Sequence, residues 1–392
     1  MLIVYPDYYK DFLCVAGECE DTCCAGWEIV IDPKSLKKYH ESKTLKRRLL
    51  RDIKWRKGTF RQCKDGRCAF LREDGLCDLY RRLGADSLCH TCRTYPRHTE
   101  EFENVREITL SISCPQVARM LMERSEPVRF LEWETDAEEC YEDFDYFLFS
   151  CLTDARAVMI GILQNRKLAI DERLLLVLGI AHDLEVRFRL GRLGETDDVL
   201  TRAQSPLALR QVRRQLAQLR CEPVKNYERA KKHFYRLCRL ERLRDEWDQL
   251  LIETQMILYV QGADSYAALQ EEFACWIAAH LPELSVQLEQ LAVYFISTYF
   301  AGAVYDGRIY GKADTAVGYV AQLYDLFAAR WLKNEKQLDA EDVIEIVYRY
   351  SREIEHSDPN LEMMEQQRWW RIDHNDRKGD SICRSEEQKT KI

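Results

Sequence analysis

The distribution of its cysteines constrains this chain more than any other feature of the sequence. Ten of the sixteen cysteines fall within the first 114 of 392 residues, where an even spread would place about five. They are Cys14, Cys19, Cys23, Cys24, Cys63, Cys68, Cys77, Cys89, Cys92 and Cys114. Thiolates only a few residues apart repel one another unless a cation neutralises them, so this density predicts a metal site in the N-terminal third.

The chemistry of this predicted site has three alternatives. Disulfides need an oxidising compartment, but the N-terminus lacks the features of a secretory signal, so a cytoplasmic address is expected. Zinc takes four ligands, commonly from paired knuckles, and neither ten thiols nor the Cys23-Cys24 doublet suits that pattern. Iron–sulfur clusters accept thiolates from scattered loops and use Cys-Pro sequences such as Cys114-Pro115. An iron–sulfur centre, of the 4Fe-4S type first of all and present once or twice, is favoured over zinc.

The sequence predicts a mainly α protein with a small mixed α+β cysteine-rich region at its N-terminus. Two short strands are expected, Trp27–Ile31 and Glu107–Ser113, and Asp32-Pro33 is expected to open a basic helix. From about Val117 onward, apolar residues recur at helical spacing. The long helical patterns cover residues 141–163, 172–190, 206–219, 224–260, 266–300 and 315–332. The expected domains are residues 1–120, which bind metal, an all-α domain over residues 121–350 that could bind substrate, and a charged tail over residues 351–392.

The charge distribution argues against nucleic acid as a partner, because a net charge of −8 leaves no general basic surface for phosphates. The segment Lys37–Arg67 is instead strongly basic, with thirteen Lys and Arg against three acids. It is either a solvated helical face or a docking site for an acidic partner. The apolar run Leu291–Tyr305 is shorter than the ~20 residues of a membrane span, so no membrane partner is expected.

Two familiar signatures of S-adenosylmethionine and nucleotide enzymes are missing. The radical S-adenosylmethionine motif, Cys-x3-Cys-x2-Cys, begins with Cys19 and Cys23 but has Gly26 at its third position. A Gly-x-Gly-x-x-Gly loop between a strand and a helix, typical of Rossmann folds, is also not found. The sequence alone therefore does not locate a cofactor pocket.

Taken in order, the cysteine pattern resembles the flagellin lysine N-methylase family. The resemblance covers about a hundred residues and rests on Cys14-x4-Cys19-x3-Cys23-Cys24-x-Gly26-Trp27, Gly66-x-Cys68, Leu76-Cys77, Leu83-Gly-Ala85, His90-Thr-Cys92-x3-Pro96-Arg97 and Ser111-x-Ser113-Cys114-Pro115. It implies methyl transfer from S-adenosylmethionine to lysine ε-amines of flagellin by an iron–sulfur enzyme. The candidate metal ligands are Cys14, Cys19, Cys23, Cys24, Cys68, Cys77, Cys92 and Cys114, with Cys63 and Cys89 in reserve.

Several residues near the motif are candidates for other roles. A lysine must lose a proton before it can attack a methyl group, and Tyr95 or His98 could accept or relay that proton. A packed tyrosine and an exposed histidine are the ordinary alternatives. Arg93 and Arg97 could hold a cofactor carboxylate or could simply be solvated. His90 could join the metal ligands, or it could make a structural hydrogen bond, and Trp27 is expected beside the metal centre.

Two functions of other classes compete with the methyltransferase. The first is a non-catalytic module in which zinc stabilises a small domain that docks a partner through Lys37–Arg67. It predicts colourless protein without affinity for S-adenosylmethionine. The second is a metal-delivery or redox-sensing protein, which should lose or interconvert its centre readily in air.

Overall fold

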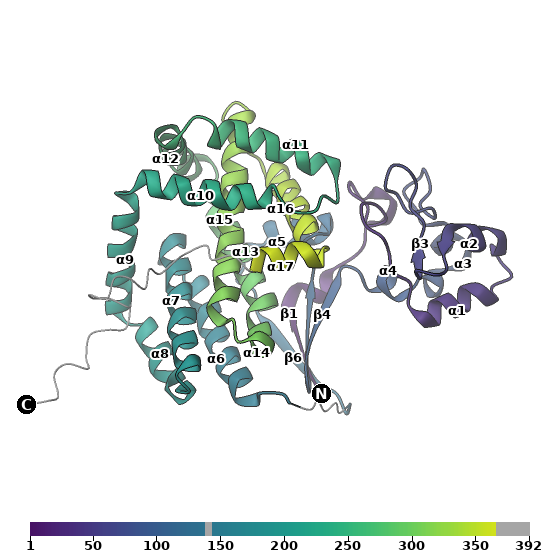
Figure 1. The fold of residues 1–392 in the computed structure, drawn as a ribbon, viewed down its shortest axis with the longest axis horizontal. Helices are drawn as coiled ribbons and strands as arrows, with labels where there is room; N and C mark the ends of the chain where they lie inside the picture. Colours follow the sequence, from purple (N-terminus) through teal and green to yellow (C-terminus); the bar gives the residue numbers. More distant parts are fainter. Residues whose placement is uncertain (138–142, 366–392) are drawn as a thin grey trace, which may run out of the picture.

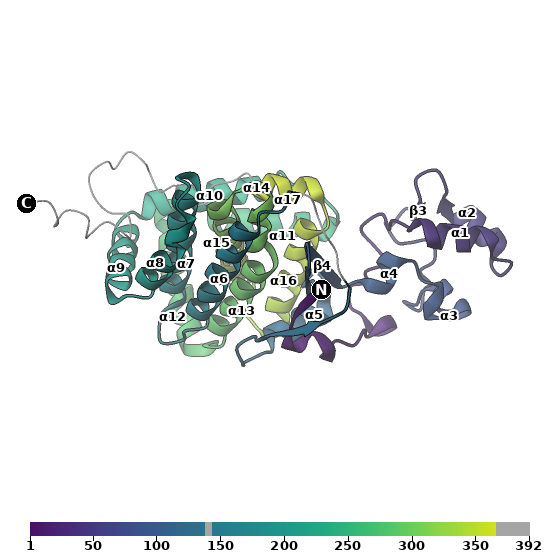
Figure 2. The ribbon, with the colours of Figure 1, turned by 90° about the horizontal axis from the view of Figure 1, so that it is seen from below.

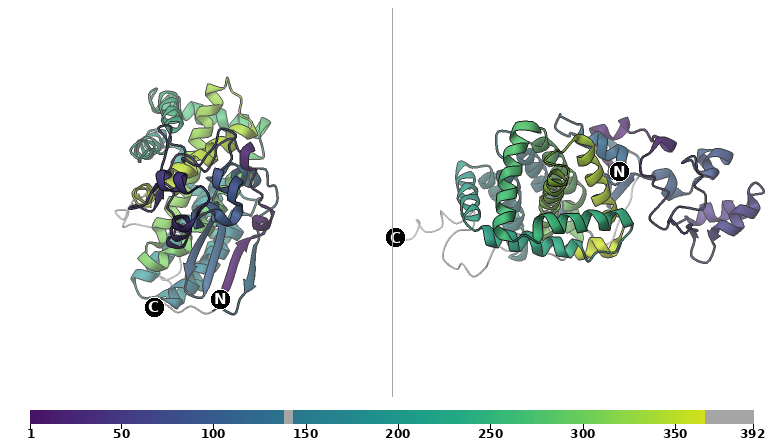
Figure 3. Two further views of the ribbon diagram at one scale, coloured as in Figure 1. Left: turned by 90° about the vertical axis from the view of Figure 1, so that its right-hand side faces the viewer. Right: turned by 90° about the horizontal axis from the view of Figure 1, so that it is seen from above.

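The computed structural model describes residues 1–137 and 143–365, and it confirms the predicted mainly α fold. A large helical body carries a four-stranded sheet on one side, and a small cysteine-rich lobe stands beyond that sheet (Figure 1). Figures 2 and 3 show the small lobe projecting from the sheet end of the body. The junction between lobe and body is therefore a distinct region of the molecule.

The sheet combines the N-terminus with residues that follow the small lobe. Its order is β4-β5-β1-β6, in which β1 pairs parallel with β5 and antiparallel with β6. Its strands are β1 (Leu2–Pro6), β4 (Arg97–Phe102), β5 (Val105–Leu110) and β6 (Phe130–Glu134). Strand β5 forms most of the predicted strand Glu107–Ser113, but it ends at Leu110. Ile112 and Ser113 form a short turn that leads to Cys114.

The body consists of helices whose apolar faces share one core. They are α5 (Pro115–Met122), α6 (Tyr146–Leu163), α7 (Ile170–Arg189), α8 (Thr196–Ala203), α9 (Pro206–Arg220), α10 (Pro223–Leu237), α11 (Asp245–Thr254), α12 (Ala263–His280), α13 (Leu284–Tyr299), α14 (Ala303–Asp306), α15 (Ile309–Lys333), α16 (Ala340–Glu355) and α17 (Asp358–Glu365). Helix α13 contains most of the predicted buried run, and nearly every side chain from Gln287 to Ile296 is buried. Helix α6 is long and apolar enough to cross a membrane by length and composition alone, a test that core helices of soluble proteins also pass.

Two of the predicted long helices are divided in the structure. The pattern over residues 266–300 breaks at Pro282, because proline cannot continue the helical hydrogen bonding. The pattern over residues 224–260 breaks between α10 and α11 without a proline or glycine. There the turn's backbone N–H groups are satisfied from elsewhere, Glu241 N by Asn360 Oδ1 at 2.7 Å and Leu243 N by Glu353 Oε2 at 2.9 Å. Tertiary hydrogen bonds replace the helical ones in this turn.

The small lobe lies between β1 and β4 in the sequence and has its own core. Its core contains Ile29, Tyr39, Leu49, Phe60 and Phe70 among others. Its elements are α1 (Pro33–Glu41), α2 (Lys46–Asp52), β2 (Ile53–Lys54), β3 (Thr59–Phe60), α3 (Asp78–Leu83) and α4 (His90–Thr94). As predicted, Asp32 caps α1, accepting a hydrogen bond from Ser35 N at 2.9 Å. The predicted strand Trp27–Ile31 does not form, and that segment makes only isolated bridges such as Val30 with Thr59.

The domain limits therefore differ from the expected ones. The expected metal-binding domain over residues 1–120 contains both the lobe and part of the sheet, and Tyr8, Phe12 and Leu110 belong to the core of the helical body. The lobe is an insertion within the first 120 residues. The reason is non-local: β1 finds its parallel partner β5 about a hundred residues further along the chain, which periodicity cannot reveal.

The expected charged tail from residue 351 also differs at its beginning. Helix α16 continues to Glu355, α17 follows it, and Ser351, Arg352 and Glu353 are at most 1% exposed. The charged residues Arg352 and Glu353 are buried because they find partners in the rest of the molecule, as described below. Residues 366–392, the rest of this expected tail, lie outside the described residues.

Candidate active site and metal centre

The cysteines of the N-terminal third form two neighbouring groups. The first group, Cys14, Cys19, Cys23 and Cys114, lies where the lobe meets the body. Electrostatic interactions link Cys23 and Cys114 to Cys14, and Cys114 to Cys19. Burial, with Cys19 and Cys14 nearby, raises the pKa of Cys114 to about 11.

The second group, Cys24, Cys68, Cys77, Cys89 and Cys92, lies in the lobe core. Cys68 and Cys89 are buried there, and the other three pack against it. A hydrogen bond with Cys89, burial, and nearby Cys24 and Cys68 raise the pKa of Cys92 far above its ordinary value. Cys89, which the sequence predicts only as a reserve ligand, is thus as much a part of this group as Cys92. Cys63 is exposed and interacts with the group through Cys68.

The Cys23-Cys24 doublet joins the two groups. The Cys23 thiol is hydrogen-bonded to Cys24, which raises the pKa of Cys23 and lowers that of Cys24 to about 7. Cys23 also interacts with Cys14 and Cys114 of the first group, and Cys24 packs against the lobe core with the second group. This arrangement explains the doublet, which a single zinc knuckle does not.

A metal ion would require these thiols to move closer together. Within residues 1–137 and 143–365, no three His, Cys, Asp or Glu side chains stand close enough to hold a metal as they are. The donor set nevertheless suits a thiophilic metal, because all fourteen described cysteines are free thiols and nine of them gather in the two groups. Of those nine, only Cys92 lies within a helix, so the loops that carry the others can bring their sulfurs together. The residues fit a cysteine-ligated centre in type, and most of them lie on loops that could bring their sulfurs together.

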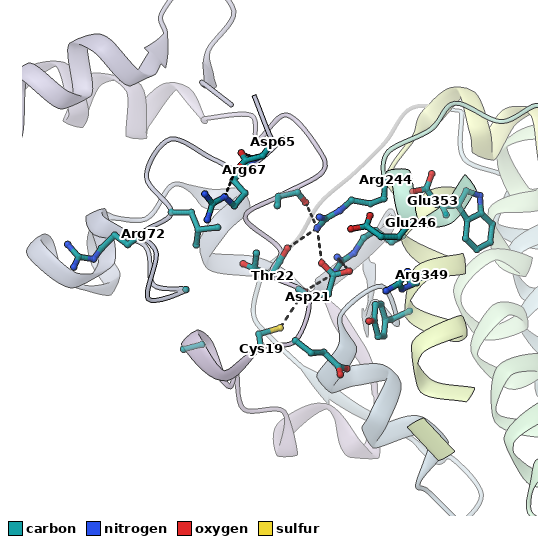
Figure 4. Close-up of a pocket in the computed structure, with 18 of the residues that line it drawn as sticks. Cys19, Asp21, Thr22, Asp65, Arg67, Arg72, Arg244, Glu246, Arg349 and Glu353 are labelled. Carbon is teal, nitrogen blue, oxygen red and sulfur yellow. Dashed lines mark hydrogen bonds and ion pairs between the residues drawn. The ribbon is translucent and has the colours of Figure 1, made fainter. Parts of the chain in front are cut away.

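Asp21, between these cysteines, ties the lobe to the body. Its Oδ2 lies 2.5 Å from Nη1 of Arg352 and its Oδ1 accepts from Nη2 of Arg244 at 2.8 Å. Arg244 also donates to the backbone oxygens of Thr22 and Ala25 (Figure 4). Gly26 must be a glycine here, because its φ is +96° and an added Cβ would lie 2.4 Å from Nε of Arg244.

Aromatic rings lie beside the ion pairs that Asp21 makes with Arg352 and Arg244. The Trp27 ring stacks on the His356 ring with centroids 4.5 Å apart, and Tyr95 lies 5.8 Å from Trp27. The guanidinium of Arg352 lies 5.2 Å from the Trp27 centroid. The lobe therefore meets the C-terminal end of α16 through one aromatic and cationic cluster.

A chain of hydrogen bonds runs from Tyr95 into the body. Tyr95 OH is 3.0 Å from Ser113 Oγ, which is 2.7 Å from Ser111 Oγ and 2.6 Å from His356 Nε2. Ser111 Oγ donates to Glu355 Oε2 at 3.3 Å, and Tyr294 OH donates to the same oxygen at 2.8 Å. The chain connects the end of β5 to the last turn of α16.

The two acid–base groups at the end of this chain have shifted pKa values. Burial raises the pKa of Glu355, although Tyr294 OH donates to it and the nearby hydroxyls of Ser351 and Tyr299 also favour its charged form. Burial, with Arg352 and His98 nearby, lowers the pKa of His356 to about 4, so its imidazole is neutral at pH 7. Such shifts are typical of groups that handle protons.

The other sequence candidates lie around this chain. His98, on the edge strand β4, is hydrogen-bonded to Glu100 at 2.6 Å, which raises its pKa. Arg97 rests on the rings of Tyr9 and Phe12 and does not enter the cluster. His90 is exposed and donates its backbone N–H to Asp32, and Arg93 is exposed on α4.

The basic segment Lys37–Arg67 forms one end of the small lobe. Some of its cations are used inside the lobe: Arg48 pairs with the fully buried Asp78 at 2.5 Å, and Arg51 pairs with Asp52. Others, such as Lys43 and Arg47, are exposed. Both interpretations of this segment stay open.

The sequence analysis missed Asp21, Arg244, Arg352, Glu355 and His356. The last three are spaced so that Arg352 and His356 lie one turn apart on α16. The sequence predicts a charged tail there, because a buried charge looks the same in a sequence as an exposed one. The signal that could have found them is the apolar pattern of α16, in which Val343, Ile346, Val347, Tyr350 and Ile354 continue at helical spacing past residue 351.

Comparisons with known proteins agree on one family. Residues 156–375 match the FliB lysine N-methylase C-terminal domain. The lysine-N-methylases of Salmonella choleraesuis (strain SC-B67) and Salmonella typhimurium are each 33% identical over 129 residues, which is 31% of this chain and 32% of each relative. The flagellar biosynthetic protein FliU of Salmonella muenchen is 32% identical over 129 residues, 31% of this chain and 76% of that protein. The chain thus spans about a third of the length of the two lysine-N-methylases that it matches.

Solved structures add no relative, because none gives a significant match. The domain match covers more than half of the 392 residues and includes α16, which supplies Arg352, Glu355 and His356 to the site. The chain therefore belongs to the FliB lysine N-methylase family, which confirms the family that its cysteine pattern resembles.

Proposed function

We propose that this protein is a protein-lysine N-methyltransferase that transfers methyl groups from S-adenosylmethionine to lysine ε-amines of flagellin. Family membership supports the transfer to lysine, and the similarity to the flagellar biosynthetic protein FliU supports a flagellar substrate. One structural observation carries the proposal. Residues of the cysteine motif, Tyr95 and Ser113, share a hydrogen-bonded chain with Glu355 and His356 of the matched domain.

This chain can take up the proton that a lysine must lose. An ammonium has no lone pair, so the proton has to leave before the nitrogen attacks. The route would run from Tyr95 through Ser113 and Ser111 to Glu355, whose raised pKa makes it a better proton acceptor than an ordinary carboxylate. The buried cation of Arg352 beside the cluster would also disfavour a second positive charge and so lower the lysine pKa.

The transfer itself moves one electron pair. The lysine nitrogen forms a bond to the methyl carbon, the carbon–sulfur bond breaks, and its electrons remain on sulfur, which gives S-adenosylhomocysteine. When bound, S-adenosylmethionine supplies the electrophilic methyl group. The residues of this chain would orient the amine, exclude water and remove the proton.

We further propose that the two cysteine groups hold iron–sulfur centres, with zinc as the alternative metal. Cys14, Cys19, Cys23 and Cys114 would hold one, and four of Cys24, Cys68, Cys77, Cys89 and Cys92 the other. Polar methyl transfer needs no one-electron step, so we assign these centres to the architecture of the site. They would fix the loops that carry Asp21 and Trp27 against the body.

Methyl transfer to purified flagellin tests the proposed function. The full chain, purified without oxygen, should move label from methyl-labelled S-adenosylmethionine onto flagellin lysines, located by mass spectrometry of peptides. Free flagellin without enzyme is the control. Absence of transfer by metal-loaded protein would contradict the proposal.

Variants of the proton route should lower the turnover number more than flagellin binding. We expect Glu355→Gln and Tyr95→Phe each to reduce kcat by about 10²-fold, because positioned acid–base groups contribute on this order. Glu362→Gln, on the exposed side of α17, is the matched control. Equal kcat for Glu355→Gln and wild type would show that the proton leaves by another route.

The pH dependence provides a second readout of the same route. The wild-type rate should rise with pH through the raised pKa of Glu355, because only its carboxylate accepts a proton. Tyr294 OH donates to Glu355, the hydroxyls of Tyr299 and Ser351 lie nearby, and His98 lies near enough to interact with it. His98→Gln should therefore shift this limb toward higher pH, and Glu355→Gln should abolish it.

A further inference from the structure

A cavity of about 400 Å³ lies between the small lobe and the helical body. Loop residues from Ala16 to Ala25 and from Asp65 to Gly75 form its lobe side, and Arg244, Trp247, Tyr348, Arg349 and Glu353 are among those on its body side. Figure 4 shows Arg67 and Arg72 on the lobe side, with Arg244, Glu246 and Arg349 on the body side. Its volume lies within the range of about 300–1,000 Å³ of small-molecule sites.

Several polar atoms of this wall are buried and unsatisfied. Among the described residues, Nε1 of Trp247, Nε of Arg352 and Oε1 of Glu353 have no hydrogen-bond partner, and each side chain belongs to a residue only 1% exposed. Nε of Arg244 is in the same state. Buried donors and acceptors are almost always paired in folded proteins, so this concentration in one wall indicates a missing polar ligand.

The charges of the cavity match a ligand that carries both signs. The lining contains the arginines Arg67, Arg72, Arg244, Arg349 and Arg352 and the acids Glu20, Asp21, Asp65, Glu73, Glu246 and Glu353. Guanidinium groups suit a carboxylate, and the acids suit an ammonium or a sulfonium. A phosphate ligand would meet six acids against five arginines, which disfavours it.

The geometry points to this cavity as the binding site of the methyl donor, and we propose that it holds the amino-acid end of S-adenosylmethionine. This inference rests on the proposed methyltransferase function and goes beyond it by giving the donor a place. Arg352 supports the assignment, because it lines the cavity and also contacts Trp27 and the backbone oxygen of Ser113. Cys19 lines the cavity too, so a metal centre of the first group would border the donor.

The cavity between the sheet and α6 is a weaker alternative. It is somewhat larger, about 480 Å³, but its wall is mostly apolar. No cysteine is among its lining residues.

Direct binding to the full chain, measured by calorimetry without flagellin, tests the inference. S-Adenosylhomocysteine, which cannot transfer a methyl group, is the probe. Trp247→Phe removes one unpaired donor while keeping an aromatic ring, and Glu353→Gln keeps the shape of the side chain. We expect each to weaken binding by about tenfold, the typical effect of one polar contact. Trp276→Phe, outside this cavity, is the matched control.

A second probe tests whether the cavity binds the amino-acid end of the donor. A variant at an exposed lining residue separates lost binding from misfolding. 5′-Methylthioadenosine lacks the amino and carboxyl groups and should bind at least about tenfold more weakly than S-adenosylhomocysteine. Glu246→Lys changes an exposed lining residue and should weaken binding without loss of thermal stability. Unchanged binding in all three cavity variants, with active wild type, would overturn the location and leave the proposed function standing. Absence of both binding and methylation in wild type would overturn both.

Discussion

Serine substitutions in one cysteine group are expected to remove the metal bound by that group and to leave the metal of the other group. Cys23→Ser with Cys114→Ser should empty the first group, and Cys68→Ser with Cys92→Ser should empty the second. Each pair removes two thiols that interact within its own group, and a metal centre rarely survives the loss of two ligands. The measurement is iron, zinc and sulfide per chain in protein purified without oxygen.

Methylation should follow the metal in this experiment. Because the first group borders Asp21 and Trp27, its loss should reduce flagellin methylation by at least about tenfold, the usual scale for removing the support of a site. Cys221→Ser with Cys275→Ser, both exposed on the helical body, is the matched control. If all three pairs kept full metal, the cysteine groups would not be the binding sites. Loss of all metal from either single pair would indicate one shared centre in place of two.

The second large effect is expected at Asp21. Asp21→Asn leaves Arg352, which is 1% exposed, as a buried cation without its carboxylate. Stranding a buried charge typically costs about 3–5 kcal/mol of the free energy of unfolding. Arg352 keeps its bonds to the backbone oxygens of Asp21 and Ser113, so the lower end of that range is expected. Denaturant unfolding of matched wild-type and variant samples measures it.

A double-mutant cycle separates this effect from general damage. Adding Arg352→Met to Asp21→Asn removes the stranded cation, so the double variant should recover at least about 1 kcal/mol over Asp21→Asn alone. Asp65→Asn breaks an exposed pair with Arg67 and should change stability by less than about 1 kcal/mol. If the double variant were less stable than Asp21→Asn, the ion pair would not explain the burial of Arg352.

Local patterns made much of the fold predictable from the sequence. Asp32-Pro33 starts a helix because the Asp32 side chain caps it and Pro33 suits its first position. Strand β5 follows from the alternation of apolar and polar residues over a few positions. The helical body follows from apolar spacing, which depends only on neighbours three and four residues away. These signals are contained within single segments, so no partner segment has to be known.

The remaining features depend on contacts between distant residues. Ser111 and Glu355 are 244 positions apart, and Arg352 and Asp21 are 331 apart. No periodicity connects such pairs, so the charges of α16 were assigned to solvent and the lobe was merged with the sheet. The sequence does single out the clustered cysteines and Tyr95 as candidates, because residue type and short spacing carry that information.

The most direct test of a metal centre at the lobe–body junction is the metal and sulfide content of the full chain, purified without oxygen. We expect brown protein with a broad absorption band near ~400 nm and matching amounts of iron and acid-labile sulfide, as cysteine-ligated clusters give. Colourless protein with stoichiometric zinc would contradict the iron–sulfur assignment and favour the zinc-stabilised binding module. Protein with no stoichiometric metal would contradict the metal centre itself.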